Sequence, residues 1–189
     1  RSHRLGQEVE IWGIVCYALS SIGEHREVIQ WMSDWKGRSD MKPWMFRNLV
    51  DSHLELGELE EARAALQSYM DLPLRDHSWP PARLWVAIEA AARGDWESAR
   101  QVGQELTVDQ LGESEACLFR WVVPFGEWMG GQRPEPGAEA IANLLISLGD
   151  AKGMRGLRQW IRQAAKHAAR TGPGWRNRLR LRWEWLLRG

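Results

Sequence analysis

The chain has 189 residues and no formal net charge, with 44% hydrophobic and 26% charged residues, which is ordinary for a folded soluble protein. No stretch reaches the roughly 18 consecutive apolar residues that a membrane-spanning helix requires, so we expect a cytoplasmic protein. The 13 tryptophans are unusual. Rings of this size fill protein cores or act as anchors on a binding surface.

Six helices are predicted in the first 106 residues, because apolar residues recur there every three or four positions. A glycine stands at the turn inside each pair of helices, at Gly23, Gly57 and Gly94. Gly57 suits a position just past a helix end, where a positive φ is favourable. Asp95 is expected to cap the sixth helix. The predicted ranges are 7–21, 25–36, 43–56, 58–70, 80–93 and 95–106.

The turn glycines lie 34 and 37 residues apart, which indicates a repeated helix–turn–helix unit. The longer interval contains a proline-rich stretch at residues 72–81. Two amphipathic helices joined by so short a turn lie antiparallel, and one pair cannot bury both apolar faces alone. The sequence therefore predicts an all-α array of stacked helical hairpins.

Five positions recur at similar distances from the glycine in each unit: a large residue, an aliphatic residue, the glycine, a residue two positions later and a small residue five positions later. They are Trp12, Val15, Gly23, His25 and Val28; Phe46, Leu49, Gly57, Leu59 and Ala62; and Arg83, Val86, Gly94, Trp96 and Ala99. Over about residues 8–107 this pattern resembles the tetratricopeptide repeat family. The resemblance implies an α–α superhelix, from whose pattern Val28 and Arg83 depart.

The resemblance also implies a ligand-binding groove, because in this family the first helix of each pair lines a concave surface that holds peptides. Asn48 stands where the family often has an Asn that contacts the ligand backbone, and an amide both donates and accepts. Arg47 suits a ligand carboxylate, and aromatic residues suit apolar ligand side chains. The predicted groove residues are Tyr17, Trp44, Arg47, Asn48, Asp51 and Trp85, with Glu10, Gly13, Ile14, Pro81, Leu84 and Ile88 beside them.

The chain departs from the family members that clamp a peptide carboxylate. Gly13 stands where that clamp has a lysine, and Leu84 and Trp85 replace basic or polar residues. Capture of a free peptide C-terminus is therefore not expected. Simple packing between helices is the alternative interpretation for Trp44 and Trp85.

The register of the repeats is lost after residue 107. Residues 114–129 are apolar enough for a buried helix, which Pro124 is expected to kink or break. The sequence GGQRPEPG at residues 130–137 predicts a loop. It divides the chain into helical repeats (1–129) and a helical C-terminal cap (130–189), which we expect to form one continuous body. Helices are predicted over 138–148 and 151–170.

The C-terminal region is basic: residues 151–189 hold 11 basic residues and one acid, whereas residues 1–150 hold 14 basic and 24 acidic residues. Interleaved Arg and Trp can contact phosphates and stack on bases, or lie at lipid headgroups. The alternative is that the rings pack on the last helices and the arginines are solvated or paired. Over 175–189, alternation favours a strand and the helical neighbourhood favours a helix. The basic residues singled out are Arg155, Arg158, Arg162, Lys166, Arg178, Arg180 and Arg182.

No catalytic residue, metal site or cofactor is predicted. Cys16 and Cys117 lie in apolar helical surroundings and are expected to be buried, reduced thiols. None of the five histidines has metal-ligand spacing. The glycine-rich stretches lack the preceding strand and the lysine of a phosphate-binding loop.

The sequence therefore predicts a non-enzymatic scaffold for protein–protein interaction that binds a peptide or a partner surface in the groove, alone or as a module of a larger protein. Binding of nucleic acid or an anionic surface through residues 155–188 is the alternative. A third interpretation is a fragment of an enzyme whose catalytic part lies outside these residues.

Overall fold

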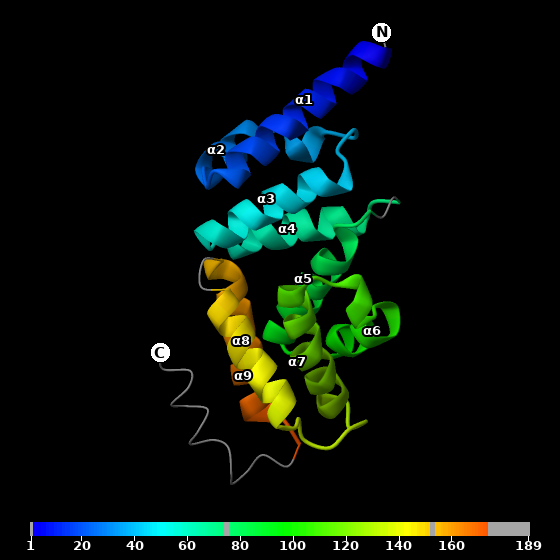
Figure 1. Ribbon diagram of the computed structural model, residues 1–189, viewed down its shortest axis with the longest axis vertical. Helices are drawn as coiled ribbons and strands as arrows, with labels where there is room; N and C mark the ends of the chain where they lie inside the picture. The colour runs from blue at the N-terminus through cyan, green and yellow to red at the C-terminus, as the bar shows by residue number, and fades with distance from the viewer. Residues whose placement is uncertain (1, 74–75, 152–153, 174–189) are drawn as a thin grey trace. The chain divides into compact units, whose positions relative to one another are not determined.

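The computed structural model describes residues 2–73, 76–151 and 154–173 (Figure 1). The only regular secondary structure in this part of the chain is helical, and it contains no strand, which confirms the all-α fold class for it. The helices are α1 Ser2–Ser21, α2 His25–Trp31, α3 Pro43–Leu56, α4 Leu59–Met70, α5 Trp79–Ala92, α6 Glu97–Glu105, α7 Glu113–Met129, α8 Ala138–Asp150 and α9 Arg155–Thr171, with short 3-10 helices η1 Trp35–Gly37 and η2 Val108–Gln110.

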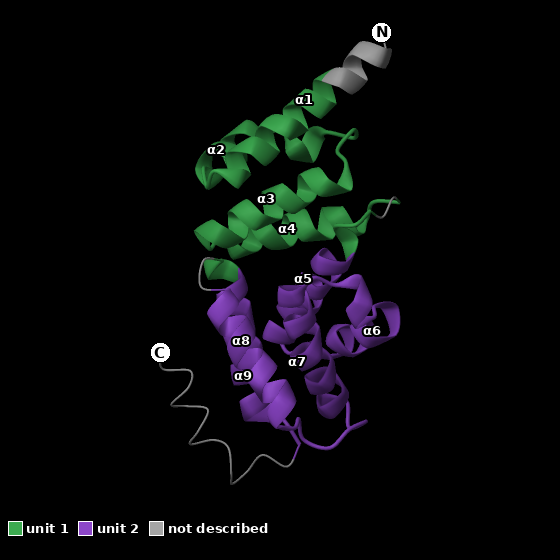
Figure 2. Ribbon diagram, in the orientation of Figure 1, with its two compact units in different colours: residues 1–79, 154–156 green, residues 80–153, 157–189 purple. Residues whose placement is uncertain are grey.

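The chain forms two compact units (Figure 2). Unit 1 comprises residues 1–79 and 154–156, and unit 2 comprises residues 80–153 and 157–189. The predicted loop at 130–137 is present, but it lies inside unit 2, where it joins α7 to α8. These two helices pack against each other, so the loop is a connection within a unit and does not separate the two units.

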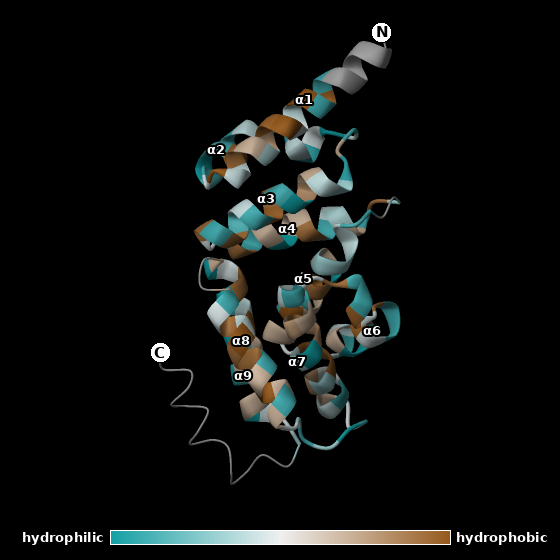
Figure 3. Cartoon of the chain, viewed as in Figure 1, coloured by the Kyte–Doolittle hydropathy of each residue, from teal (hydrophilic) through white to brown (hydrophobic). Residues whose placement is uncertain are grey.

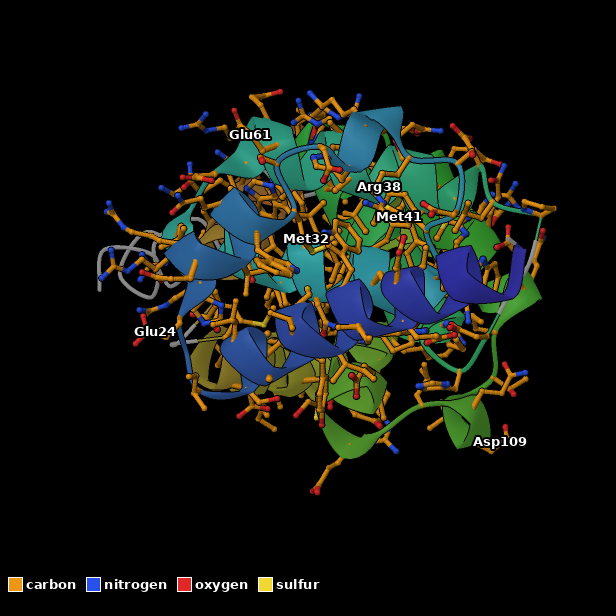
Figure 4. The ribbon with its side chains drawn as sticks, turned by 90° about the horizontal axis from the view of Figure 1, so that it is seen from above. Glu24, Met32, Arg38, Met41, Glu61 and Asp109 are labelled. Atoms are coloured by element: carbon orange, nitrogen blue, oxygen red, sulfur yellow. The ribbon has the colours of Figure 1, made fainter. Side chains whose placement is uncertain are left out.

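Unit 1 is built from two helical hairpins, in which α1, α2 and α3 pack on one another and α3 packs on α4. The interior is sealed by fully buried side chains such as Val28, Met32 and Leu49. Figure 4 looks down on this unit, with Met32 toward the middle of the view and Glu61 at its edge. Apolar burial of this kind is the main favourable term in folding.

The turn glycines behave as the repeat pattern predicts. Gly23, Gly57 and Gly94 have φ angles of 82°, 78° and 92°, in the left-handed region that favours glycine. At the end of α3, the backbone N–H groups of Gly57 and Glu58 donate to the carbonyls of Leu54 and His53 at 3.2 and 2.9 Å. These bonds satisfy carbonyls that would otherwise lack a hydrogen-bond donor at the helix end.

The structure has no break at Pro124, and the predicted N-cap at Asp95 is wrong. The helix α7 runs through Pro124 without a break, because Trp121, Phe125 and Trp128 on either side of this proline are held in the core of unit 2. The sixth helix begins at Glu97, so Asp95 is not its N-cap residue. The Asp95 carboxylate nevertheless accepts a hydrogen bond from the backbone N–H of Glu97 at 3.2 Å.

Aromatic rings fill the core of unit 2. On α7, Trp121 and Trp128 each meet Phe125 edge to face, with ring centroids 5.8 and 6.1 Å apart. Trp96, which precedes α6, stacks on Phe125 at 6.2 Å. Edge-to-face and offset-stacked contacts are the favourable arrangements for aromatic rings. These three tryptophans therefore serve the core and are not surface anchors.

A hydrogen-bonded cluster connects the end of α4 to the start of α5. The Tyr69 hydroxyl contacts Ser78 Oγ and donates to Asp76 Oδ1 at 3.2 Å, and the Ser78 backbone N–H donates to the same oxygen at 2.9 Å. Burial raises the pKa of Tyr69 to about 12. For Asp76, burial opposes the charged form, but the hydrogen bonds from Ser78 and Tyr69 prevail and hold its pKa below the ordinary value.

Tyr69 is expected to ionise in the folded protein near pH 12, well above the ordinary tyrosine pKa of about 10. The fold favours the protonated phenol, so this contribution to stability is fully present below about pH 10 and is lost as the pH rises toward about 12. The Tyr17→Phe variant leaves Tyr69 as the sole tyrosine. Its phenolate absorbance should be read directly after a pH jump, with a urea-unfolded sample as control. Equal midpoints in the two samples would contradict this prediction.

Candidate binding surface

The first helix carries apolar residues on two opposite faces. Its inner face, with Val9 and Cys16, is buried. The outer face exposes Ile11 and Ile14 at 61% and 57%. Figure 3 shows apolar segments along the α1 ribbon. A helix that is apolar all round is normally covered on both sides. We name the exposed set the outer face of α1; it comprises Ile11, Ile14, Tyr17 and the adjoining Ile22.

Tyr17 and Trp44 are positioned by the close approach of α1 to α3. Tyr17 is 61% exposed, whereas Trp44 is half-buried against α1. A Cβ on Gly13 would lie 2.5 Å from both Trp44 Cη2 and Met45 Cε. The predicted groove residue Gly13 is therefore a packing contact, where the missing side chain lets the two helices meet.

Arg47 and Asp51 pair with each other along α3. Arg47 Nε donates to Asp51 Oδ2 at 3.2 Å, and both side chains are about three-quarters covered. With Trp44 and Asn48 they share one face of α3, since positions three, four and seven residues apart are neighbours on a helix. A ligand carboxylate would have to compete with Asp51 for the Arg47 guanidinium.

Asn48 lies deeper than the family resemblance implies, with 9% of its surface exposed. Its Nδ2 is buried and has no hydrogen-bond partner among the residues that the structure describes. The Cys16 thiol lies beneath the same surface, 2.9 Å from Met32 Sδ. Burial raises the pKa of Cys16 to about 12, with Asn48 opposing and Asp51 adding to the shift. A thiol with so high a pKa is not a nucleophile at neutral pH.

The remaining predicted groove residue, Trp85, belongs to the interior of unit 2. It lies on α5 and is 3% exposed, as the alternative interpretation of packing between helices expects. The surface of unit 1 therefore presents most of Tyr17, part of Trp44, Arg47 and Asp51, and hardly any of Asn48.

The basic residues predicted on the last helix lie on α9. Arg155 and Lys166 are exposed, and Arg158 and Arg162 are half-buried. The opposite face of α9 is buried through Leu157, Trp160, Ile161, Ala164, Ala165 and Ala168. The other three predicted basic residues, Arg178, Arg180 and Arg182, lie outside the described residues, as does the question of helix or strand over 175–189.

Two histidines of unit 1 lie within hydrogen-bonding distance of another side chain. The Nδ1 atom lies 3.2 Å from Ser52 Oγ in His25 and 2.8 Å from Glu58 Oε2 in His53. In the part of the chain that the structure describes, no three His, Cys, Asp or Glu side chains are grouped to hold a metal ion.

Cys16 and Cys117 are buried free thiols, as predicted. No helix of the described residues is long and apolar enough to cross a bilayer.

Two features were not foreseen from the sequence. The exposure of Ile11 and Ile22 could not be predicted from the sequence, because it depends on which other helices cover α1. The apolar residues on all sides of 11–22 do indicate that this helix has a second contact face. Arg83 occupies the large apolar position of the repeat and is buried all the same. Its Nε and Nη2 atoms donate to the two carboxylate oxygens of Glu105 at 2.6 and 3.1 Å.

Comparison with known proteins finds no match for this chain among protein-family models, curated proteins or solved structures. The tetratricopeptide resemblance therefore stays a prediction that rests on the residues of the three repeats.

Proposed function

We propose that the protein is a non-enzymatic helical-repeat scaffold that binds an amphipathic helix or an apolar peptide on unit 1, through the outer face of α1 and the adjoining surface of α3. The observation that carries this proposal is the outer face itself, whose four large apolar side chains are 57–72% exposed. Contiguous exposed apolar surface on a folded protein usually marks an interaction site.

The repeat interpretation is supported by the equal burial of matching positions. Val28, Ala62 and Ala99 each stand five residues after a turn glycine, and each is completely buried. Terminal units of a helical superhelix usually carry a polar outer face. The outer face of α1 is apolar instead, so it suits one more helix stacked upon it.

The charges around this face favour a partner with basic flanks. Among the described side chains of α1, the charged ones are Glu8 and Glu10. Glu10 forms an ion pair with Lys42, so the exposed Glu8 is the acidic group that a partner's cation would meet. Complementary charge at the rim of an interface steers association and selects among partners. An apolar stripe bordered by Lys or Arg is therefore the chemistry that we expect of the bound helix.

Ile14→Glu is expected to abolish partner binding while changing the free energy of unfolding by no more than about 0.5 kcal/mol, because the side chain is exposed. The matched control is Gln30→Glu on α2, which adds the same charge at another exposed site of unit 1. A photo-crosslinking residue at position 14 of the full chain should capture a partner that Ile22→Glu removes. Equal cross-linking from positions 14 and 30 would refute the proposal.

A further inference from the structure

The α9 helix carries a row of basic side chains along one face. Arg158, Arg162, Lys166 and Arg170 recur every four residues, so neighbours stand about 6 Å apart and the row is about 18 Å long. We call these four residues the basic row. The helix contains no acidic residue, and within the described residues none of the four makes an ion pair.

The helix that carries the basic row is held in place by its buried face. The opposite face of α9 is sealed in unit 2 by Trp160, Ile161 and Ala164, which are at most 1% exposed. Near its end, Trp96 Nε1 donates a hydrogen bond of 3.0 Å to His167 Nδ1. Since its apolar face is already buried, α9 cannot insert that face into a lipid surface, as interfacial amphipathic helices do.

One arginine of the basic row, Arg158, has a hydrogen-bond donor without an acceptor in the described part of the chain. Its Nε is buried yet has no hydrogen-bond acceptor among the described residues. An unsatisfied donor of a charged group is costly. Because this Nε is itself covered, the terminal Nη groups of the guanidinium are the donors that an anionic oxygen over the row would meet. Arginine is also the side chain best suited to phosphate, because its planar fork donates two parallel hydrogen bonds.

We propose that the basic row binds the phosphate backbone of double-stranded nucleic acid without sequence selectivity. A row of cations at regular steps of about 6 Å, inclined to the helix axis, suits a regularly spaced line of phosphates. Gln159 and Gln163 are exposed beside the row and can donate further hydrogen bonds to phosphate and sugar oxygens. Single strands are bound chiefly by stacking on exposed rings, whereas Trp160, the aromatic residue of α9 besides His167, is buried.

The acidic remainder of the chain does not cancel this site. The net charge over residues 151–189 is strongly positive, with 11 basic residues and one acid. At physiological salt, charges beyond a Debye length of about 8 Å are largely screened. A polyanion that contacts the basic row therefore meets the local positive charge first. This inference is independent of the proposed partner site on α1, which belongs to unit 1.

The test measures binding of the full chain to a fluorescently labelled, mixed-sequence DNA duplex as a function of salt. Four phosphate contacts give a slope of log K against log salt of about −3.6, a loss of roughly 150-fold between about 50 and 200 mM. Arg162→Gln with Lys166→Gln should reduce the magnitude of the slope by about 1.8. Arg26→Gln with Arg120→Gln removes the same charge from exposed positions elsewhere and should leave the slope unchanged.

The two double variants distinguish binding by the basic row from binding by net charge. A smaller slope in the α9 variant alone, with unchanged circular dichroism, supports the proposal. An equal effect of both double variants, or of neither, overturns it, because binding would then come from net charge or from residues outside the row. Tighter binding of single-stranded DNA, of polyglutamate or of phosphatidylserine vesicles than of the duplex also overturns it. Ile14→Glu should leave duplex binding intact, which separates this site from the proposed partner face.

Discussion

Gly126→Ala is expected to destabilise unit 2 by about 2–3 kcal/mol, although alanine is the better helix former by up to about 1 kcal/mol. Gly126 lies within α7 where this helix packs on α6. A Cβ there would lie 2.6 Å from the backbone nitrogen of Arg100 and 3.0 Å from the carbonyl carbon of Ala99. Backbone atoms cannot rotate away as side chains can, so the two helices would have to separate.

Gly149→Ala is the matched control in the same unit. Gly149 lies in the last turn of α8, and no described atom lies within 4 Å of a Cβ placed there. This substitution should therefore stabilise the protein by about 0.5 kcal/mol, because it only restricts the unfolded chain. Urea unfolding followed by circular dichroism measures both changes. A Gly126→Ala variant as stable as Gly149→Ala would contradict the close contact between α6 and α7.

The continuous helix at Pro124 and the close packing at Gly126 could not be predicted from the sequence. The helix-and-turn pattern is encoded locally, so spacing alone predicts α3 over 43–56 and the positive φ of Gly57. Pro124 also carries a local signal, but the burial of Trp121 and Phe125 on either side outweighs it. Nothing in the residues around Gly126 indicates that another helix passes so closely.

The candidate partner site was likewise predictable from the sequence only in part. Repeat spacing places Tyr17, Trp44 and Asn48 on the first helices of their hairpins, and the structure has them there. Spacing gives the face of a helix but not the depth at which a side chain lies. Asn48 is covered because α1 and α3 approach closely at Gly13, and this approach is a tertiary fact that a single repeat does not encode.

Arg83 is the clearest case of a departure from the repeat pattern that the fold accommodates. The large apolar position of the third repeat holds a guanidinium whose Nη1 also donates to Ser98 Oγ at 3.2 Å. Its side chain is 9% exposed, whereas that of its partner Glu105 is 40% exposed. The pair therefore links α5 to α6 with one ion inside the unit and one at its edge. This asymmetry sets the expected response to substitution.

Glu105→Gln is expected to cost about 2–3 kcal/mol, because it removes the carboxylate from a guanidinium that water reaches poorly. Arg83→Met should cost less, about 1–2 kcal/mol, because the methionine fills the buried space and the carboxylate left behind is partly solvated. In the double variant Arg83→Met with Glu105→Gln, neither charge remains, and the loss should stay near that of Arg83→Met alone. Together with the unsubstituted protein, the three variants form a double-mutant cycle with a coupling of about 2–3 kcal/mol.

The order of the two single variants distinguishes a buried ion pair from an exposed one. An exposed pair is worth at most about 1 kcal/mol, and either deletion would then cost the same. If Glu105→Gln is neutral while Arg83→Met destabilises, the guanidinium contributes through its other contacts, such as the hydrogen bond to Ser98 Oγ, and not through its pairing with Glu105. If the coupling is present, α5 and α6 are joined by charge at the position where the other two repeats use Trp12 and Phe46. An apolar pair introduced there, Arg83→Leu with Glu105→Leu, should then restore most of the stability.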